Sequence, residues 1–222
     1  MKNQVVNTFI SKHIMRVRTP KNTGTLKNIG KFPSLKNKST VWFESHLERD
    51  FIYLTEFDKN VIKYQEQPFK VKYLLNGKIR QYTPDFLIKR QDKKEIVEVK
   101  PQHKIENEEF IKFSTQIKAF LAGEGYEYLV VTDLTIRRQP RLANTKLFWR
   151  YARIPITTRT EVLIQELLGD LSSISFSELC LFLSRSGEQK ELIYALLFHG
   201  YLLTDIEKPI TGESLISIGD FN

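Results

Sequence analysis

A segment of 18 residues, TPDFLIKRQDKKEIVEVK at positions 83–100, constrains the fold most strongly. Two short apolar runs flank a polar stretch at 91–94, a pattern that predicts a β-hairpin. Asp85 opens the first strand, and Glu98 and Lys100 lie two residues apart on the second. Because side chains alternate across a strand, Glu98 and Lys100 face the same side of the sheet. We therefore expect three charged groups to converge at one point.

These three groups have the chemistry of a phosphodiester-cleaving site. Asp85 and Glu98 supply hard oxygen ligands of the kind that Mg²⁺ or Mn²⁺ prefers. Lys100 beside the ion would orient an attacking water and stabilise negative charge on a phosphate. The structural alternative is a solvated Glu–Lys pair on an exposed strand. Val97 and Val99, which alternate with the charged residues, favour a half-buried strand and hence the site.

The segments around this hairpin predict an α/β domain. Residues 45–57 carry an apolar stripe at helical spacing, which predicts a helix. Ser45, with Glu48 three residues later, predicts a capping box at its start. Capping the helix is therefore the structural explanation for Glu48, as opposed to a role in the site. The Asn76-Gly77 pair between apolar runs predicts a second hairpin. The order helix, mixed sheet, helix, strand fits an α/β core. The remaining predicted elements are strands at 61–66, 69–75, 78–82 and 128–132 and a helix at 105–121.

Positive charge is concentrated at the N-terminus. The chain has a formal net charge of +8, and its first forty residues hold nine Lys or Arg and no acidic residue. Such a segment either contacts the DNA backbone or is a solvated tail. Arg80, on the strand that enters the site, either approaches a phosphate or lies on an exposed strand face. The candidates for DNA binding are Arg16, Arg18, Lys31, Lys36, Lys38 and Arg80.

A second basic stretch, 137–153, is interleaved with aromatic residues and fits either backbone DNA contact or a helix that packs its aromatics on the core. A boundary is expected near Pro155. Beyond it, three helices and two strand-like runs predict a winged helix. Its nearly balanced charge argues against major-groove reading and allows a protein-contact role equally well. The elements are helices at 160–168, 176–183 and 189–199 and strands at 201–205 and 214–218.

Composition excludes several classes of protein. A single cysteine excludes an intramolecular disulfide and, with only four histidines, argues against a Cys/His zinc site. No apolar run approaches the ~20 residues of a membrane span. We expect a cytoplasmic protein with no membrane partner.

Four segments in order carry a family resemblance. They are ESHLERDFIYLTEFD at 44–58, YQEQPFKVKY at 64–73, RQYTPDFLI at 80–88 and VEVKP at 97–101. The chain resembles TnsA, the endonuclease subunit of heteromeric Tn7-like transposases, over roughly residues 15–135. Pro84-Asp85 and Glu98-Val99-Lys100 match the PD and ExK of the PD-(D/E)xK nuclease superfamily.

The resemblance implies a restriction-endonuclease-like PD-(D/E)xK core with a mixed sheet flanked by helices. With the observations above, it gives a basic arm at 1–43, an endonuclease core at 44–154 and a small winged-helix-like domain at 155–222. It also implies that Glu48, Asp85, Glu98 and the Val99 carbonyl hold Mg²⁺ or Mn²⁺, while Lys100 positions water.

The implied function is nicking of the 5′ ends of a transposon, in a bacterial cytoplasm and at the nucleoid. The implied partners are the transposon-end DNA, a DDE transposase subunit that cuts the 3′ ends, and an AAA+ regulator. Two alternatives stay open. One is a stand-alone restriction or repair nuclease, and the other is a non-catalytic DNA-binding scaffold that recruits transposition partners.

Overall fold

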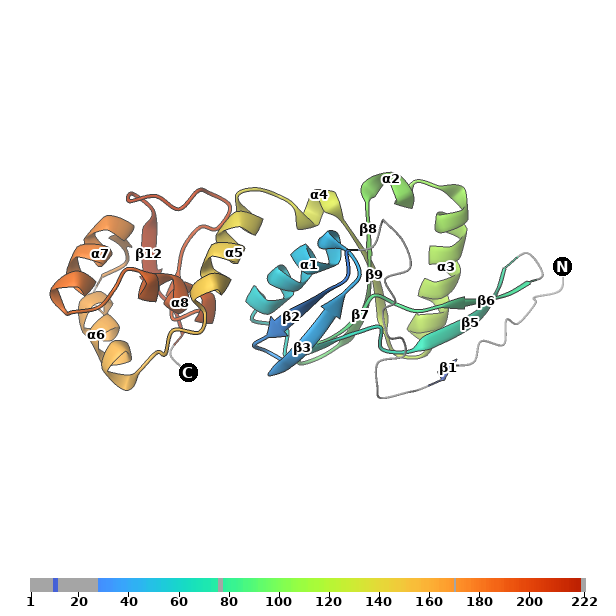
Figure 1. Cartoon of the computed structure of the whole chain (residues 1–222), viewed down its shortest axis with the longest axis horizontal. Helices are drawn as coiled ribbons and strands as arrows, with labels where there is room; N and C mark the ends of the chain where they lie inside the picture. The colour runs from blue at the N-terminus through green and yellow to red at the C-terminus, as the bar shows by residue number, and fades with distance from the viewer. Residues whose placement is uncertain (1–9, 12–27, 76–77, 170, 221–222) are drawn as a thin grey trace. The chain divides into compact units, whose positions relative to one another are not determined.

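A computed structural model describes residues 10–11, 28–75, 78–169 and 171–220 (Figure 1). Its contacts divide the chain into two compact units. The first unit comprises Met1–Ile52 and Asn60–Ile136, and the second comprises Tyr53–Lys59 and Arg137–Asn222. Within the described part of the chain, no helix is long and apolar enough to cross a membrane.

A four-stranded mixed sheet forms the centre of the first unit. Its strands are β4 (Lys63–Glu66), β7 (Phe86–Lys89), β8 (Lys94–Lys100) and β9 (Glu127–Thr132), in that spatial order. The β4–β7 and β7–β8 pairs are antiparallel, and β8–β9 is parallel. The predicted hairpin is therefore confirmed, with Phe86 opposite Val97. Strand β8 is buried from Glu95 to Val99, as expected for a central strand.

Helix α3 (Glu108–Gly123) packs on β9. Its residues Ile117 and Leu121 are buried in a hydrophobic cluster that is rich in aromatic side chains. The helix predicted at 105–121 is interrupted, because α2 (Gln102–Ile105) ends before Asn107. The Asn107 side chain accepts a hydrogen bond from the Glu109 amide and caps the start of α3. Helix α4 (Asp133–Ile136) follows β9.

Two hairpins and the first part of one helix complete this unit, because the residues of that helix from Tyr53 onward belong to the second unit. The predicted Asn-Gly hairpin is confirmed as β5 (Lys70–Leu75) with β6 (Lys78–Tyr82), and β1 (Ile10–Ser11) pairs with β5. Part of the segment expected as a basic arm forms a hairpin of β2 (Gly30–Ser34) and β3 (Ser39–Phe43). Phe32, Val41 and Phe43 are buried, so apolar burial holds this hairpin to the unit. The predicted first helix is α1 (His46–Phe57).

The second unit contains four of the eight helices described, α5 to α8. Helix α5 (Arg141–Tyr151) packs on α8 (Glu191–His199), and Phe148 is fully buried. Of the two readings of stretch 137–153, the structure therefore shows a helix that packs its aromatic residues. Around these lie α6 (Thr158–Leu168), β10 (Ile174–Ser175), α7 (Phe176–Arg185), β11 (Leu202–Leu203) and β12 (Leu215–Ile218), with sheet order β10-β12-β11.

Helix α8 is the core of this unit. Six of its nine residues are buried, and Gly200 ends it in the left-handed conformation with φ 82°. Tyr194 stacks on Phe148, Tyr151 and Phe176 at centroid distances of 6.0, 5.4 and 5.6 Å. A helix buried to this extent presents few side chains to solvent.

Candidate active site

The site lies in the first unit, where Asp85 precedes β7 and Glu98 and Lys100 end β8. The ammonium nitrogen of Lys100 is 2.5 Å from Glu98 Oε1 and 3.7 Å from Asp85 Oδ2. The hairpin register produces this arrangement, because Phe86 pairs with Val97 and places the residues beyond them side by side. The structure thus brings together Asp85, Glu98 and Lys100 from the predicted site.

Two backbone hydrogen bonds fix Asp85. Its Oδ2 accepts from the amide of Val99 at 2.8 Å, and its carbonyl oxygen accepts from the amide of Gln67 at 2.9 Å. Gln67 follows β4, whose last residue, Glu66, pairs with Phe86. Strand β8 therefore holds the carboxylate of Asp85, and the residue that follows β4 holds its backbone.

Glu98 is only 4% exposed and makes contacts through both carboxylate oxygens. Oε1 contacts Lys100, and Oε2 accepts a hydrogen bond of 2.6 Å from the Tyr82 hydroxyl. Burial, first, and the adjacent Glu98 carboxylate raise the pKa of Tyr82 well above its ordinary value, so the phenol stays protonated and donates.

Glu48 both caps helix α1 and faces the site. Its amide donates to Ser45 Oγ at 3.1 Å, and its carboxylate accepts from the Ser45 hydroxyl at 2.9 Å and from the Glu44 amide at 2.8 Å. Burial raises the pKa of Glu48 to about 7, and the charge of Asp85 adds to this effect. The structural role expected of a capping box is therefore present, together with an electrostatic link to Asp85.

The pKa of Asp85 is also affected by burial and by the neighbouring charged groups. Burial raises its pKa to about 7, with a further contribution from Glu98, while Lys100 and the Val99 amide act in the opposite direction. Burial lowers the pKa of Lys100, but the Asp85 and Glu98 carboxylates outweigh it, and the resulting pKa lies above the ordinary value. The Lys100 side chain is therefore protonated and positively charged at neutral pH.

The chemistry of these groups fits a divalent cation. The Lys100 ammonium already occupies the space between two carboxylates, so positive charge is stabilised there. Burial is the main cause of the raised pKa values of Glu48 and Asp85, and the neighbouring carboxylates raise both pKa values further, which a second cation would offset. Within the described residues, no three His, Cys, Asp or Glu side chains form a ready metal cluster. Asp85 and Glu98, with Glu48 beside them, are the donors that this chain offers.

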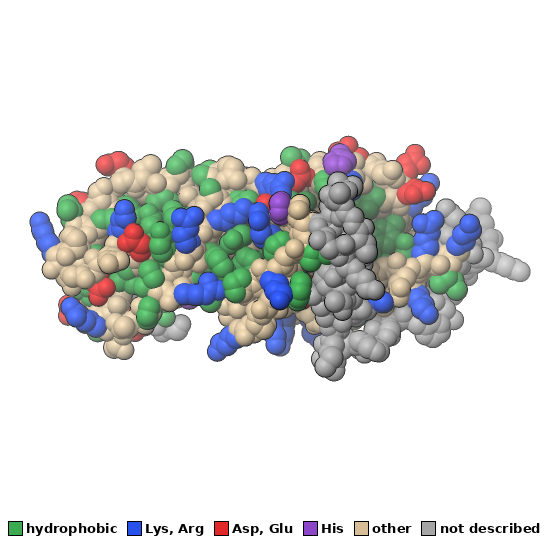
Figure 2. All heavy atoms as spheres, in the orientation of Figure 1, with side chains coloured by type: hydrophobic (Ala, Val, Ile, Leu, Met, Phe, Trp, Pro, Cys, Tyr) green, Lys and Arg blue, Asp and Glu red, His purple; other side chains and the backbone are tan. Residues whose placement is uncertain are grey.

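The predicted DNA-binding residues are not gathered at this point. The Lys31 ammonium lies over the Trp42 ring at 4.9 Å, and the Lys36 ammonium donates to the Val61 carbonyl at 2.8 Å. Lys38 is exposed in the β2–β3 turn, and Arg80 is exposed on β6. Arg16 and Arg18 lie outside the described residues. On the visible face, lysine and arginine side chains are spread over both units (Figure 2).

Three residues that the sequence analysis did not assign also belong to the site. Tyr82 holds Glu98, and the Gln67 side chain donates to Glu44 Oε1 at 2.9 Å. Gln67 adopts φ 43°, and its Oε1 is buried without a hydrogen-bond partner among the described residues. No local pattern signals these roles, since each depends on pairing between distant strands.

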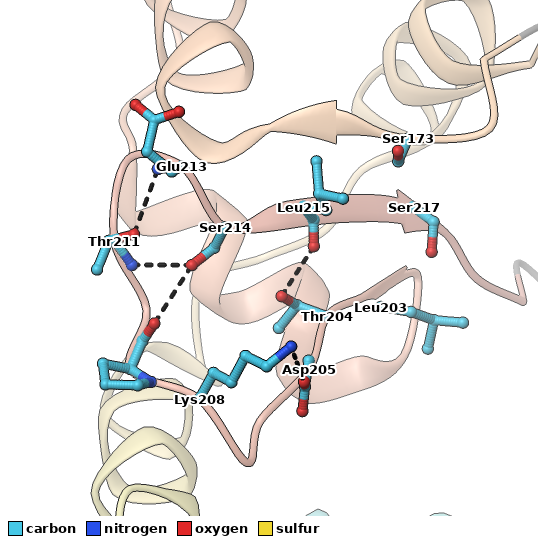
Figure 3. A pocket seen from close by; sticks show the side chains of 11 residues that line it. Ser173, Leu203, Thr204, Asp205, Lys208, Thr211, Glu213, Ser214, Leu215 and Ser217 are labelled. Atoms are coloured by element: carbon cyan, nitrogen blue, oxygen red, sulfur yellow. Dashed lines mark hydrogen bonds and ion pairs between the residues drawn. The ribbon is translucent and has the colours of Figure 1, made fainter.

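A separate pocket of about 670 Å³ lies in the second unit, around β11, β12 and the loop between them (Figure 3). Several of its polar groups bond to one another: Ser214 Oγ accepts from the Thr211 amide at 2.9 Å, and Lys208 pairs with Asp205 at 3.1 Å. Leu203 and Leu215 line it and are 52% and 64% exposed. These are features of an ordered loop beside an apolar surface and differ from the acidic centre of the first unit.

The fold and the acidic centre define a nuclease-like α/β domain. Residues 58–133 match the family model described as TnsA-like endonuclease N terminal, so this segment is similar to the nuclease domain of that family. The segment includes Asp85, Glu98 and Lys100 and begins after Glu48. Such a domain indicates the nuclease subunit of a Tn7-type transposase. No match was found among curated proteins.

Proposed function

We propose that this chain is a metal-dependent DNA endonuclease that nicks the 5′ ends of a transposon during cut-and-paste transposition. The observation that carries the proposal is the convergence of Asp85, Glu98 and Lys100 inside the segment that matches the endonuclease family. A buried and a half-buried carboxylate with a lysine suit phosphodiester hydrolysis, in which negative charge develops on the phosphate.

In this mechanism, Asp85 and Glu98 would hold Mg²⁺ or Mn²⁺, with Glu48 and the Val99 carbonyl as further donors. The bound cation supplies Lewis-acid stabilisation of the phosphate and a more acidic water. Lys100 orients the attacking water and balances charge as the bond to the leaving 3′ oxygen breaks. The Val99 amide keeps the Asp85 carboxylate in place through its 2.8 Å hydrogen bond.

We assign the second unit as a winged-helix-like domain that contacts protein partners. Its order of α6, β10, α7, α8, β11 and β12 supports the winged-helix assignment. The third helix of such a domain usually reads DNA, but α8 buries six of its nine residues and has only Lys190 as a base near its start. The exposed Leu203 and Leu215 suit protein contact. The proposed partners are a DDE transposase subunit and an AAA+ regulator.

The test is cleavage of a supercoiled plasmid that carries transposon ends, with Mg²⁺ or Mn²⁺, with and without the transposase partner. Asp85→Asn removes the central carboxylate, and Asp92→Asn, in the exposed turn of the same hairpin, is the matched control. We expect 5′-end nicks that require the partner, the cation and Asp85 and that persist in the Asp92 variant.

Other results would redirect the assignment. Robust cutting without the partner would favour a stand-alone restriction or repair nuclease. Equal cutting by wild type and Asp85→Asn would remove the metal centre and favour a non-catalytic DNA-binding scaffold.

A further inference from the structure

The hydrogen bond between Tyr82 and Glu98 joins two different sheets. Tyr82 is the last residue of β6, which pairs with β5, whereas Glu98 lies on β8 of the four-stranded sheet. The Tyr82 hydroxyl donates to Glu98 Oε2 at 2.6 Å, and both residues are more than nine-tenths buried. The phenol therefore contacts the acidic centre from the hydrophobic core, with little access to bulk water.

The surrounding core leaves the Tyr82 ring little freedom. Its edge meets the Phe113 ring of α3 with centroids 5.0 Å apart, and its backbone pairs with Val71, which is fully buried. A buried aromatic side chain held on several sides keeps its rotamer. The hydroxyl is thus a fixed donor, and Glu98 must adapt to it.

Because of this contact, the two carboxylate oxygens of Glu98 have different partners. Oε2 is bound by the phenol, while Oε1 faces the Lys100 ammonium at 2.5 Å, toward Asp85. A carboxylate restrained in this way offers one oxygen to a cation. Ca²⁺ readily takes both oxygens of a carboxylate in large, flexible shells, whereas Mg²⁺ requires a small octahedral shell.

We propose that Tyr82 is a positioning residue that holds Glu98 in a one-oxygen arrangement and so makes the centre selective for Mg²⁺ and Mn²⁺ over Ca²⁺. The inference rests on the proposed function, because it concerns the cation of that same centre. It assigns to Tyr82 a role beyond filling the core.

The test measures Mg²⁺, Mn²⁺ and Ca²⁺ binding to the full chain by isothermal titration calorimetry. Tyr82→Phe removes one oxygen atom and retains the ring. We expect Mn²⁺ affinity to fall by about tenfold, the lower end of the range for losing a residue that orients a metal ligand. Ca²⁺ affinity should stay or rise, so that the ratio of Mn²⁺ to Ca²⁺ affinity falls by about tenfold or more.

Tyr73→Phe is the matched control, because Tyr73 packs on the same Phe113 ring at 5.3 Å and lies on the neighbouring strand β5. It should leave the affinity ratio unchanged. A double-mutant cycle adds Glu98→Gln, in which Tyr82→Phe should have no further effect on the ratio. A folding defect alone would lower all affinities together and leave the ratio unchanged.

Two results separate this inference from the proposed function. If Asp85→Asn abolishes cation binding but Tyr82→Phe keeps the wild-type ratio, Tyr82 is a core residue only and the proposed function stands. If Asp85→Asn binds cations as the wild type does, the metal centre of the proposed function fails, and this inference fails with it.

Discussion

The ammonium group of Lys100 lies 2.5 Å from a carboxylate oxygen of Glu98, only two residues before it on the same strand. In the proposed function, the same two carboxylates would also hold a metal cation. Lys100 would then compete with that cation while also serving the proposed reaction, and removing it should separate these two effects.

Lys100→Met should lower DNA cleavage by at least about a hundredfold, the scale for removing a group that stabilises transition-state charge. Cation affinity should rise in the same variant, because two carboxylates lose their internal counterion. Cleavage assays and calorimetry test the two parts. The control is Lys89→Met, an exposed residue at the end of β7. Wild-type cleavage by Lys100→Met would contradict the assignment.

The crowded carboxylates should make the protein less stable as the pH rises. Because the pKa of Asp85 is raised from 3.8 to about 7 in the fold, the stabilisation that comes from its protonated form is complete below about pH 4 and is lost as the pH passes 7. In EDTA, we expect Asp85→Asn to exceed the wild type in free energy of unfolding at pH 8 by at least about 1.4 kcal/mol, the equivalent of one pKa unit. Urea unfolding at pH 5 and pH 8 measures this.

The control for this experiment is Asp92→Asn, which changes an exposed aspartate in the hairpin turn. It should follow the wild-type pH dependence, and added Mg²⁺ should flatten the wild-type curve. An Asp85→Asn variant whose stability falls with pH as steeply as the wild type would show that Asp85 does not cause the effect.

Burial of α5 can be tested through Phe148, which is 0% exposed. Phe148→Ala should reduce the free energy of unfolding by about 3–5 kcal/mol, the usual cost of truncating a buried phenylalanine. Arg150→Ala, at an exposed position of the same helix, should change it by less than about 0.5 kcal/mol. Denaturant unfolding distinguishes the two. Equal, small effects would mean that α5 lies on the surface.

Gln67 should be a position where the native residue costs stability. Its φ of 43° is a conformation that glycine adopts freely, and the buried Oε1 atom adds a desolvation cost. Gln67→Gly should therefore raise the free energy of unfolding by up to about 1 kcal/mol. Gln65→Gly, two residues earlier within β4, should lower it by roughly 0.5–1 kcal/mol. A loss of stability in Gln67→Gly would mean that the bond to Glu44 outweighs the strain.

The convergence of Asp85, Glu98 and Lys100 was predictable because it depends only on alternation within one hairpin. The Asn-Gly turn likewise predicted β5 and β6 from local residues. By contrast, the bond from Tyr82 to Glu98 joins two sheets, and neither period nor turn chemistry encodes such pairing.

Other misses have physical causes that are specific to the residues. Residues 1–43 were expected to form a basic arm, yet Pro33 lies exposed on a two-stranded hairpin, where a missing donor is tolerated, and Phe32 supplies the burial. In 105–121 the apolar period continues across Asn107, and only the capping interaction shows the break. In α5 the basic residues and the aromatic residues alternate too closely for periodicity to decide which face is buried.

Gln67 also has a consequence for protein engineering. A design method that optimises stability alone would replace it with glycine and, in doing so, would discard the side chain that holds Glu44. A deep mutational scan read separately for abundance and for transposition should therefore give opposite rankings at this position. Positions at which the two rankings differ in this way would be those whose native residue serves activity at a cost in folding stability, and they could be found without knowledge of the substrate.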